Sequence, residues 1–408
     1  MATVSTSSRR PYHVVVFGAS GFTGQFVVEE VARTIDEGPN GKLKWAVAGR
    51  SRRKLETVLN HVANTLDTPE LKCAVEVLVA DVGQPESLAI MCKQAVIVLN
   101  CVGPYRLYGE PVVKACIENG AHCIDICGEP QFLEGVQLVL DRKARESGVY
   151  IIGSCGFDSI PADMGILYTA KQFKGGTLSW PSSHLCSAIF GFADAARLRF
   201  LRKQFNHKPL PVLGAKIKKR GALFYCKEIG QYAVPFMGSD PSVVRRTQRY
   251  LYEEHQQSPV QYCAYAGVGG VCSVLKLLFS GLFFWLLVKF SIGRGLLSSF
   301  PEFFSWGMFS KGGPTKKQMD GTSFQMTFYG EGYTEGQDPC QGKPTEPGYV
   351  VTPIVMVQAA VTFLNEPHSL PERGGVFTPG TAFAKTSLIQ RLGRHGLKFT
   401  VRDQQGAS

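Results

Sequence analysis

The chain has 408 residues, of which 44% are hydrophobic and 19% charged, and its formal net charge is +11 at pH 7. This length favours two domains, and this composition excludes a mostly disordered chain. The positive charge permits an anionic partner, but the basic residues form short clusters, such as 216–220 and 245–249, that are typical of a solvated surface. No nucleic-acid-binding motif is visible, so we expect no nucleic-acid partner.

Twelve cysteines are scattered along the chain, and Cys101, Cys116 and Cys123 lie within apolar runs. No C-x-x-C pair occurs, which argues against a zinc site. The sequence also starts without the apolar core of a signal peptide. We therefore expect free buried thiols, no bound metal, and an intracellular protein that is not secreted.

Short β-branched runs alternate with amphipathic runs over the first part of the chain. The pattern predicts strands at 12–20, 44–50, 75–81, 96–104, 122–128 and 149–156, and helices at 23–35, 51–66, 85–95, 110–120 and 130–146. Ser51 is a suitable N-cap, and Gly120 a suitable C-cap. Such alternation predicts an α/β fold with a parallel sheet covered by helices on both faces, in which ligands bind at the carboxyl ends of the strands.

Three glycines, Gly18, Gly21 and Gly24, lie three residues apart between the first strand and the first helix. At such a junction the first glycine allows a sharp turn, the second lets a dinucleotide's pyrophosphate approach the backbone, and the third lets the helix pack against the strand. The helix dipole and the first backbone N–H groups favour the phosphate charge. We therefore predict a dinucleotide site, with contacts from Gly18, Ser20, Gly21, Phe22, Thr23 and Gly24.

The end of the second strand indicates which dinucleotide is preferred. NAD-binding proteins usually carry an acid there, whereas this chain has Arg50 and Ser51 followed by two more arginines. A guanidinium can hold a 2′-phosphate, so the sequence favours NADP over NAD. Asp81 is expected near the adenine, and Cys101, Val102 and Gly103 beneath the nicotinamide ribose.

Four motifs in order, GASGFTG (18–24), AGR (48–50), the run from Asn100 to Glu129, and GFDSIPADMG (156–165), resemble the saccharopine dehydrogenase-like oxidoreductases. The resemblance covers nearly the whole chain. It implies a Rossmann-type domain, a second α/β domain with a mixed sheet, and a nicotinamide cofactor. The family includes saccharopine reductases and trans-acting enoyl reductases of bacterial lipid synthesis, which suggests a role in glycolipid biosynthesis. Relatives carry a longer segment after the strand that starts at Gly175.

Hydride transfer needs a proton donor near the nicotinamide, on the loops that follow the later strands. Six side chains meet this condition: Tyr105, Tyr108, Asp125, Glu129, Asp158 and Asp163. Each has a structural alternative. The two tyrosines could pack over the cofactor, Asp125 could be a satisfied core carboxylate, and Asp158 or Asp163 could stabilise the start of a helix. The catalytic residue is therefore not assigned from the sequence.

A strongly apolar stretch runs from Val268 to Gly293, but its charge-free part covers only 277–288, and Lys276 and Lys289 flank it. A spanning helix needs about twenty residues. Three interpretations remain open: a buried core helix, a segment that lies in a membrane or lipid-droplet surface, and a single span. Both flanking lysines can extend toward water, and the basic clusters, such as 216–220 and 245–249, would then lie against anionic headgroups.

We thus expect a disordered tail at 1–10, a Rossmann domain at 11–165, a substrate domain at 166–350 with a membrane-associating apolar insertion at 268–293, and a return to the Rossmann domain at 351–408. The expected function is NAD(P)-dependent reduction of a small or lipid-linked C=C or C=N bond at a membrane, on a lipid droplet or mitochondrion. A homodimer through the second domain is also considered. The alternatives are a non-catalytic nucleotide-binding membrane protein and a saccharopine reductase of lysine metabolism.

Overall fold

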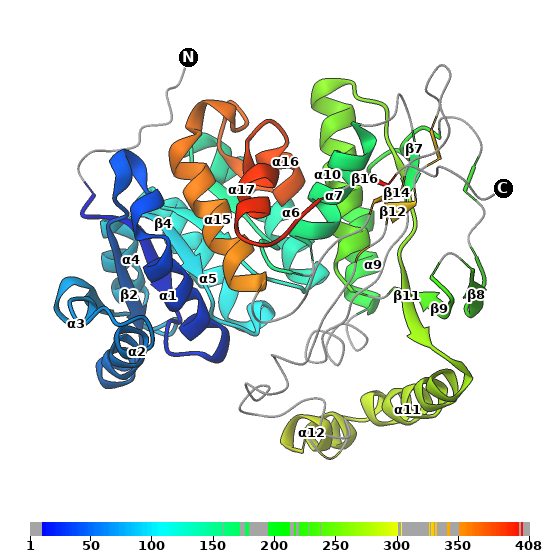
Figure 1. The fold of residues 1–408 in the computed structure, drawn as a ribbon, viewed down its shortest axis with the longest axis horizontal. Coiled ribbons are helices and arrows are strands. Elements are labelled where there is room, and N and C mark those ends of the chain that lie inside the picture. The colour runs from blue at the N-terminus through cyan, green and yellow to red at the C-terminus, as the bar shows by residue number, and fades with distance from the viewer. Residues whose placement is uncertain are drawn as a thin grey trace. The chain divides into compact units, whose positions relative to one another are not determined.

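The computed structural model describes residues 10–157, 159–171, 176–178, 195–212, 216–217, 220–227, 229–236, 238–300, 303, 326, 328–329, 331–332, 341–342, 351–399 and 401–402. The chain divides into two compact units (Figure 1). The first comprises residues 1–160 and 346–398, and the second comprises residues 161–345 and 399–408.

A seven-stranded parallel sheet forms the centre of the first unit, in the order β15-β6-β5-β4-β1-β2-β3. Its strands are β1 (Tyr12–Phe17), β2 (Trp45–Gly49), β3 (Glu76–Val79), β4 (Ala95–Asn100), β5 (His122–Asp125), β6 (Tyr150–Ile152) and β15 (Gly375–Phe377). The chain order reverses between β1 and β4, so their carboxyl ends form a ligand-binding edge of the Rossmann type. The predicted α/β fold with a Rossmann-type parallel sheet is confirmed.

Helices cover both faces of this sheet, with α1 and α15 on one face and α5 and α6 on the other (Figure 1). The helical segments of the unit are α1 (Phe22–Arg33), η1 (Ile35–Glu37), η2 (Pro39–Gly41), α2 (Arg52–Thr65), α3 (Leu71–Ala74), α4 (Pro85–Gln94), α5 (Tyr105–Asn119), α6 (Pro130–Glu146), α15 (Val351–Asn365), η3 (Pro367–Ser369), α16 (Pro379–Phe383) and α17 (Leu388–Arg394). All residues of β2, β4 and β5 are buried, as expected for strands covered on both sides.

Local sequence signals explain several element boundaries. The Ser51 hydroxyl accepts a hydrogen bond from the Lys54 amide at 3.4 Å and caps α2, as predicted. Gly120 adopts the left-handed conformation, with φ of 69°, and ends α5, also as predicted. However, α5 begins at Tyr105 rather than near Glu110, because the Glu129 carboxylate, from a later loop, accepts hydrogen bonds from its first amides.

The second unit is built from short strands and helices. Its elements are α7 (Ile160–Ala170), whose first residue belongs to the first unit, β7 (Gly176–Leu178), α9 (Ala195–Gln204), β8 (Phe224–Cys226), β9 (Gln231–Pro235), α10 (Asp240–His255), β10 (Gln261–Tyr262), β11 (Tyr265–Gly269), α11 (Val271–Lys289), α12 (Ser291–Ser299), β12 (Phe328–Tyr329), β13 (Glu331–Gly332), β14 (Gln341–Gly342) and β16 (Val401–Arg402). The strands form a mixed sheet, β10-β7-β13, and two antiparallel sheets, β11-β9-β8 and β12-β14-β16.

The last strand differs from the prediction. The final segment was expected to return to the Rossmann domain as a whole, and β15 does join the large sheet. By contrast, β16 pairs antiparallel with β14 and belongs to the second unit. A local sequence pattern carries no information about which distant strand a short segment pairs with.

The apolar stretch forms α11, a helix of 19 residues with a mean hydropathy of 2.2 over its most apolar window, of which only 11% is buried. Phe279, Leu282 and Trp285 are among its exposed side chains. The buried-core interpretation is therefore wrong for this helix. By length and composition, α11 is the one helix of the described residues that could cross a membrane.

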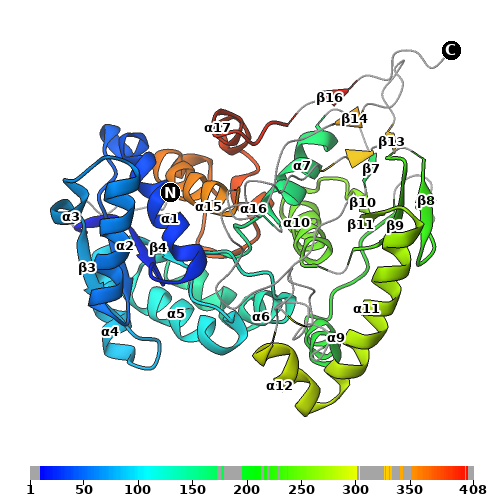
Figure 2. The same ribbon diagram turned by 60° about the horizontal axis from the view of Figure 1, so that its bottom comes forward.

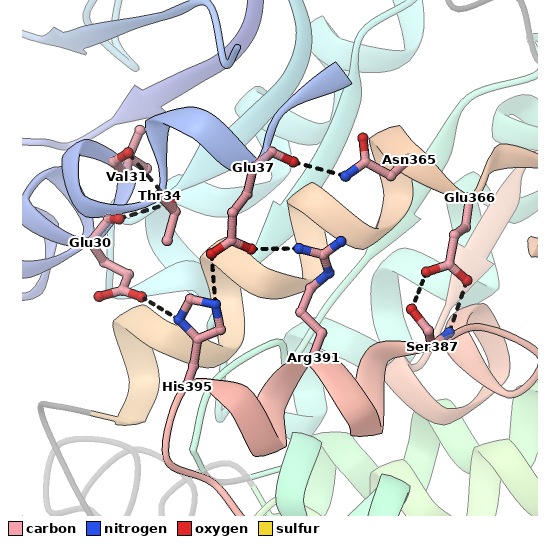
Figure 3. Close-up of polar contacts among 9 residues, drawn as sticks. All are labelled: Glu30, Val31, Thr34, Glu37, Asn365, Glu366, Ser387, Arg391 and His395. Carbon is pink, nitrogen blue, oxygen red and sulfur yellow. Dashed lines mark hydrogen bonds and ion pairs between the residues drawn. The ribbon is translucent and has the colours of Figure 1, made fainter. Parts of the chain in front are cut away.

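The C-terminal helices are tied to the end of α1 by a network of charged side chains (Figure 3). Glu37 accepts hydrogen bonds from the Arg391 guanidinium at 2.5 Å and the His395 Nε2 at 2.8 Å, and its carbonyl accepts one from the Asn365 amide at 2.8 Å. The His395 Nδ1 lies 3.6 Å from the buried Glu30, which also faces Arg33. These two carboxylates, Glu30 first, raise the pKa of His395, although partial burial opposes the shift.

The stability of the first unit against unfolding should therefore depend on pH through the protonation of His395. Because its folded-state pKa lies above the value of about 6.5 in an unfolded chain, its stabilisation is fully present below about pH 6.5 and is lost as the pH rises through the folded-state value. We expect the difference in thermal midpoint between the wild type and His395→Gln to be larger at pH 6 than at pH 8, as measured by differential scanning fluorimetry. The exposed His61→Gln is the matched control, and equal differences at both pH values would contradict the assignment.

Candidate nucleotide-binding site

The glycine-rich turn between β1 and α1 is held by unusually close backbone packing. Gly18 has a φ of 84°, and its amide donates to the Ala48 carbonyl at 2.9 Å. A Cβ atom on Gly24 would lie 2.2 Å from the Gly18 carbonyl oxygen, so only glycine lets α1 start this close to the turn. Gly21 differs, because it is exposed and a Cβ there would meet only the Gly18 carbonyl oxygen, at 3.1 Å.

Gly21 is also the N-cap of α1, and no side chain caps the helix at this position. The first turn of α1 therefore presents its backbone amides at the carboxyl edge of the sheet, where a helix amino terminus favours an anion. Ser20, Phe22 and Thr23 are half-buried around this turn. The arrangement brings together all six residues predicted for the pyrophosphate in one short turn.

The segment after β4 lies directly against the glycine turn. The Cys101 amide donates to the Phe17 carbonyl at 2.8 Å, and a Cβ on Gly18 would come within 2.8 Å of a Val102 methyl group. Cys101 and Val102 are half-buried, whereas Gly103 is exposed. Burial, with the nearby Asp125, raises the pKa of the Cys101 thiol to about 12, which disfavours the reactive thiolate form.

At the carboxyl end of β2, Arg50 is exposed and Ser51 is half-buried as the cap of α2. Arg52 is used structurally, because its guanidinium donates to the Val77 carbonyl at 3.0 Å. Asp81, after β3, accepts a hydrogen bond from the Gly83 amide at 2.9 Å and stabilises its own turn. Arg50 thus remains the predicted 2′-phosphate ligand, and an adenine contact from Asp81 stays a prediction.

Three of the predicted proton donors hold the loops around this edge together. The Tyr105 hydroxyl is buried and donates to the Asn100 carbonyl at 2.7 Å, and burial, with Asp125 second, raises its pKa well above the usual value. Asp125 is buried and accepts hydrogen bonds from the Cys127 amide at 2.9 Å and the Ser154 amide at 3.1 Å. Glu129 accepts from the amides of Tyr105 and Arg106, at 2.9 and 3.1 Å.

The other candidates are placed differently. Tyr108 lies in the first part of α5 and is 44% exposed, and no hydrogen bond to its hydroxyl is found among the described residues. Asp163 lies in the first turn of α7, in the second unit, and accepts a hydrogen bond from the Thr247 hydroxyl at 2.7 Å. Asp158 lies outside the described residues.

Two residues at this edge were given no role of their own by the sequence analysis. Asn100 ends the otherwise apolar β4, and its side-chain oxygen accepts from the Val102 amide at 3.1 Å, while its amide nitrogen is buried without a hydrogen-bond partner in the described structure. Ser154, after β6, has a φ of 63° and is buried. Serine rarely adopts this conformation, and such strain is concentrated at functional sites. A polar residue that ends an apolar strand was the available signal for Asn100.

These features fit a dinucleotide. The turn is narrow where Gly18 and Gly24 lie and open at Gly21, and the buried Asn100 amide nitrogen is an unused donor at the strand-order reversal. An exposed arginine stands where an NAD-binding protein usually carries an acid. Fold and site together define a dinucleotide-binding protein of the Rossmann type.

Comparisons with known proteins agree. Residues 14–152 match the family model described as "Saccharopine dehydrogenase NADP binding domain". The chain is 56% identical to the human "Saccharopine dehydrogenase-like oxidoreductase", with 97% of this chain and 98% of the relative covered. The chain therefore belongs to the saccharopine dehydrogenase-like oxidoreductases, and it is an NAD(P)-dependent oxidoreductase with an NADP-binding domain. The human alignment spans 422 positions, so the relative carries residues that this chain lacks.

Two further comparisons extend this result. A Caenorhabditis elegans relative named "Lipid droplet localized protein" is 35% identical over 96% of this chain and 99% of its own. The solved structure of apo saccharopine dehydrogenase (L-Glu forming) from Saccharomyces cerevisiae is 12% identical, with a TM-score of 0.53 over 97% of this chain and all of its own. At this identity the yeast structure supports the fold only.

The role of Glu129 can be tested directly. In Glu129→Ala, the amides of Tyr105 and Arg106 lose their acceptor and the start of α5 loses a stabilising negative charge, which should cost about 1–2 kcal/mol. We expect these two amides to exchange hydrogen at least about fivefold faster, as measured by mass spectrometry. Glu110→Ala, which removes an exposed carboxylate from the same helix, is the control and should leave them unchanged. Equal exchange in both variants would contradict the capping role.

Proposed function

We propose that this chain uses NADPH to reduce a small or lipid-linked C=C or C=N bond at a membrane or lipid-droplet surface. The observation that carries the proposal is the open glycine turn at the amino terminus of α1, with Arg50 at the end of the neighbouring strand. When bound, the nicotinamide supplies the hydride. The backbone amides of the turn would bind the pyrophosphate, and the Arg50 guanidinium would bind the 2′-phosphate.

The same reaction needs one proton, and we propose Tyr108 as its donor. Tyr105 and Glu129 already use their polar atoms to hold the loops, and Asp125 is a buried acceptor of main-chain amides. Tyr108 lies in the first part of α5, which begins two residues after Gly103, and it is 44% exposed, so its hydroxyl is available for a substrate atom. An uncommitted phenol can transfer a proton without loss of a structural hydrogen bond.

A lipid surface is supported by the exposed apolar side chains of α11 and by the name of the worm relative. Lipid droplets are the proposed location, and a mitochondrial membrane is the alternative. We also propose a homodimer through the second unit. A second candidate function, nucleotide binding without turnover, is favoured by the structural use of the predicted acids Tyr105, Asp125 and Glu129. Saccharopine reduction gives no reason for an exposed aromatic helix.

The preference for NADPH should depend on Arg50. In Arg50→Ala, the 2′-phosphate loses a charged hydrogen-bond partner, and we expect the Kd for NADPH to rise about 10- to 100-fold. The Kd for NADH should change less than about twofold, since NADH has no 2′-phosphate. Calorimetry measures both values. Arg53→Ala, at an exposed position, is the control. If the affinity for NADPH falls in Arg53→Ala and not in Arg50→Ala, the 2′-phosphate contact is made by Arg53.

Binding itself is tested at Gly21, where a Cβ atom would meet only the Gly18 carbonyl oxygen, at 3.1 Å. Gly21 has φ −73° and ψ 165°, which an N-cap aspartate readily adopts, so we expect Gly21→Asp to fold with a shift of a few tenths of an ångström at the Gly18 carbonyl. Its carboxylate would repel the pyrophosphate, and we expect NADPH affinity to fall at least about 100-fold. Gly21→Asn introduces a side chain of the same size without the negative charge, and it should lower the NADPH affinity much less.

Turnover separates the candidate functions. We expect the wild type to oxidise NADPH in the presence of an extracted lipid fraction, but not with saccharopine precursors, and Gly21→Asp to be inactive. NADPH binding with no oxidation in any fraction would favour the non-catalytic alternative. If folded wild-type protein takes up neither NADPH nor NADH, the oxidoreductase proposal is overturned.

A further inference from the structure

The two helices that follow β11, α11 and α12, pack against each other. α11 and α12 are separated by a single residue, Phe290, whose backbone is extended, and the chain turns sharply between them (Figure 2). A Cβ on Gly293 would lie 2.1 Å from the Leu287 carbonyl oxygen, so the backbones of the two helices are in direct contact there. Val288 and Leu297 are buried between the helices, and Phe284 and Leu287 pack around them.

Outside this small cluster, the apolar side chains are exposed. On α12, Ile292 is 79% and Leu296 is 40% exposed. On α11, the exposed side chains are not confined to a narrow stripe. Leu277 and Phe279 are both exposed. In an α-helix, residues two positions apart point in directions that differ by about 160°, so these two side chains lie on nearly opposite faces. A protein partner would cover one stripe, whereas a lipid phase surrounds a helix on several sides. The flanking Lys276 and Lys289 are exposed and suit anionic headgroups.

Both ends of this segment are anchored in the same unit. β11, immediately before α11, pairs with β9, and β13, after α12, pairs with β7. A chain that crosses a bilayer once cannot return to the same unit without a second crossing. A second crossing needs about twenty apolar residues, and the sequence between 300 and 328 contains Lys311, Lys316, Lys317 and Asp320. One helix of spanning length therefore does not imply a span.

We propose that α11 and α12 form a monotopic hairpin, which lies in a single lipid leaflet and leaves it on the side from which it entered. This proposal rests on the membrane association proposed above and specifies its form. The surface of a lipid droplet is a phospholipid monolayer, so a single leaflet is also all that the proposed location offers. Gly293 is the residue that sets the geometry, because it allows α12 to pack against the end of α11 and places the apolar residues of both helices in the same layer.

Accessibility to a membrane-impermeant maleimide tests the topology of the wild-type chain bound to vesicles of phosphatidylcholine and phosphatidylserine. Cys272, at the start of α11, is a native exposed thiol, and Ser299→Cys places a second thiol at the exposed end of α12. Labelling of Cys272 is obtained from the difference between the wild type and Cys272→Ser, and labelling at 299 from the difference between Ser299→Cys and the wild type. We expect both positions to react from outside without detergent. Protection of one position until detergent is added would show a span and overturn the hairpin.

A matched pair of glycine variants tests the geometry. Gly293→Ala forces the helix backbones apart and should weaken vesicle binding about tenfold, since α12 no longer lies beside α11 in the leaflet. Gly281→Ala, in the middle of α11, meets no atom within 4 Å and should bind as the wild type does. A lipid-free dimer with no vesicle binding would assign the apolar surface to a second copy and overturn the proposal. NADPH affinity, measured on the same samples, reports separately on the proposed function.

Discussion

The close approach of α1 to the turn at Gly18 is the constraint on which the first unit depends. The Gly24 Cα lies where a side chain would collide with the Gly18 carbonyl oxygen, and the Gly18 Cα lies where a side chain would collide with Val102. Side-chain-free positions on both sides of the turn thus allow β1, α1 and the segment after β4 to meet at one point. That point is where the strand order reverses, so the packing that stabilises the sheet also exposes the helix terminus to a ligand.

Most of the first unit follows from the sequence because local signals and burial agree there. The apolar run of β4 before Asn100, the Ser51 cap and the Gly120 turn each specify an element without help from distant residues. The start of α5 was misplaced because its cap comes from Glu129, in a loop that follows the next strand. The unit to which β16 belongs was misplaced for the same reason, since strand pairing is a long-range property.

For the candidate site, the sequence identified the backbone features but not the use of the side chains. The spacing of the glycines shows which positions carry no side chain, and this can be read directly from the amino-acid sequence. The roles of Tyr105, Asp125 and Glu129 depend on which main-chain amides and carbonyls the fold brings near them. A carboxylate that accepts two amide hydrogen bonds stabilises a loop and is costly to remove. In a single sequence, such a structural carboxylate looks the same as a catalytic acid. Asn100 shows the converse, because its unused donor is visible only in the folded structure.

The exposed helix α11 poses an energetic problem that the two units do not solve on their own. Transferring a fully exposed large apolar side chain out of water is worth about 1.5–3 kcal/mol, and α11 leaves many such side chains exposed. The small cluster around Val288 and Leu297 recovers little of this free energy, although it packs α12 against the end of α11. A packing contact that sets geometry without burying the apolar surface is expected when the remaining burial is supplied by a lipid phase. A fold optimised for water alone would have covered α11 with its own residues.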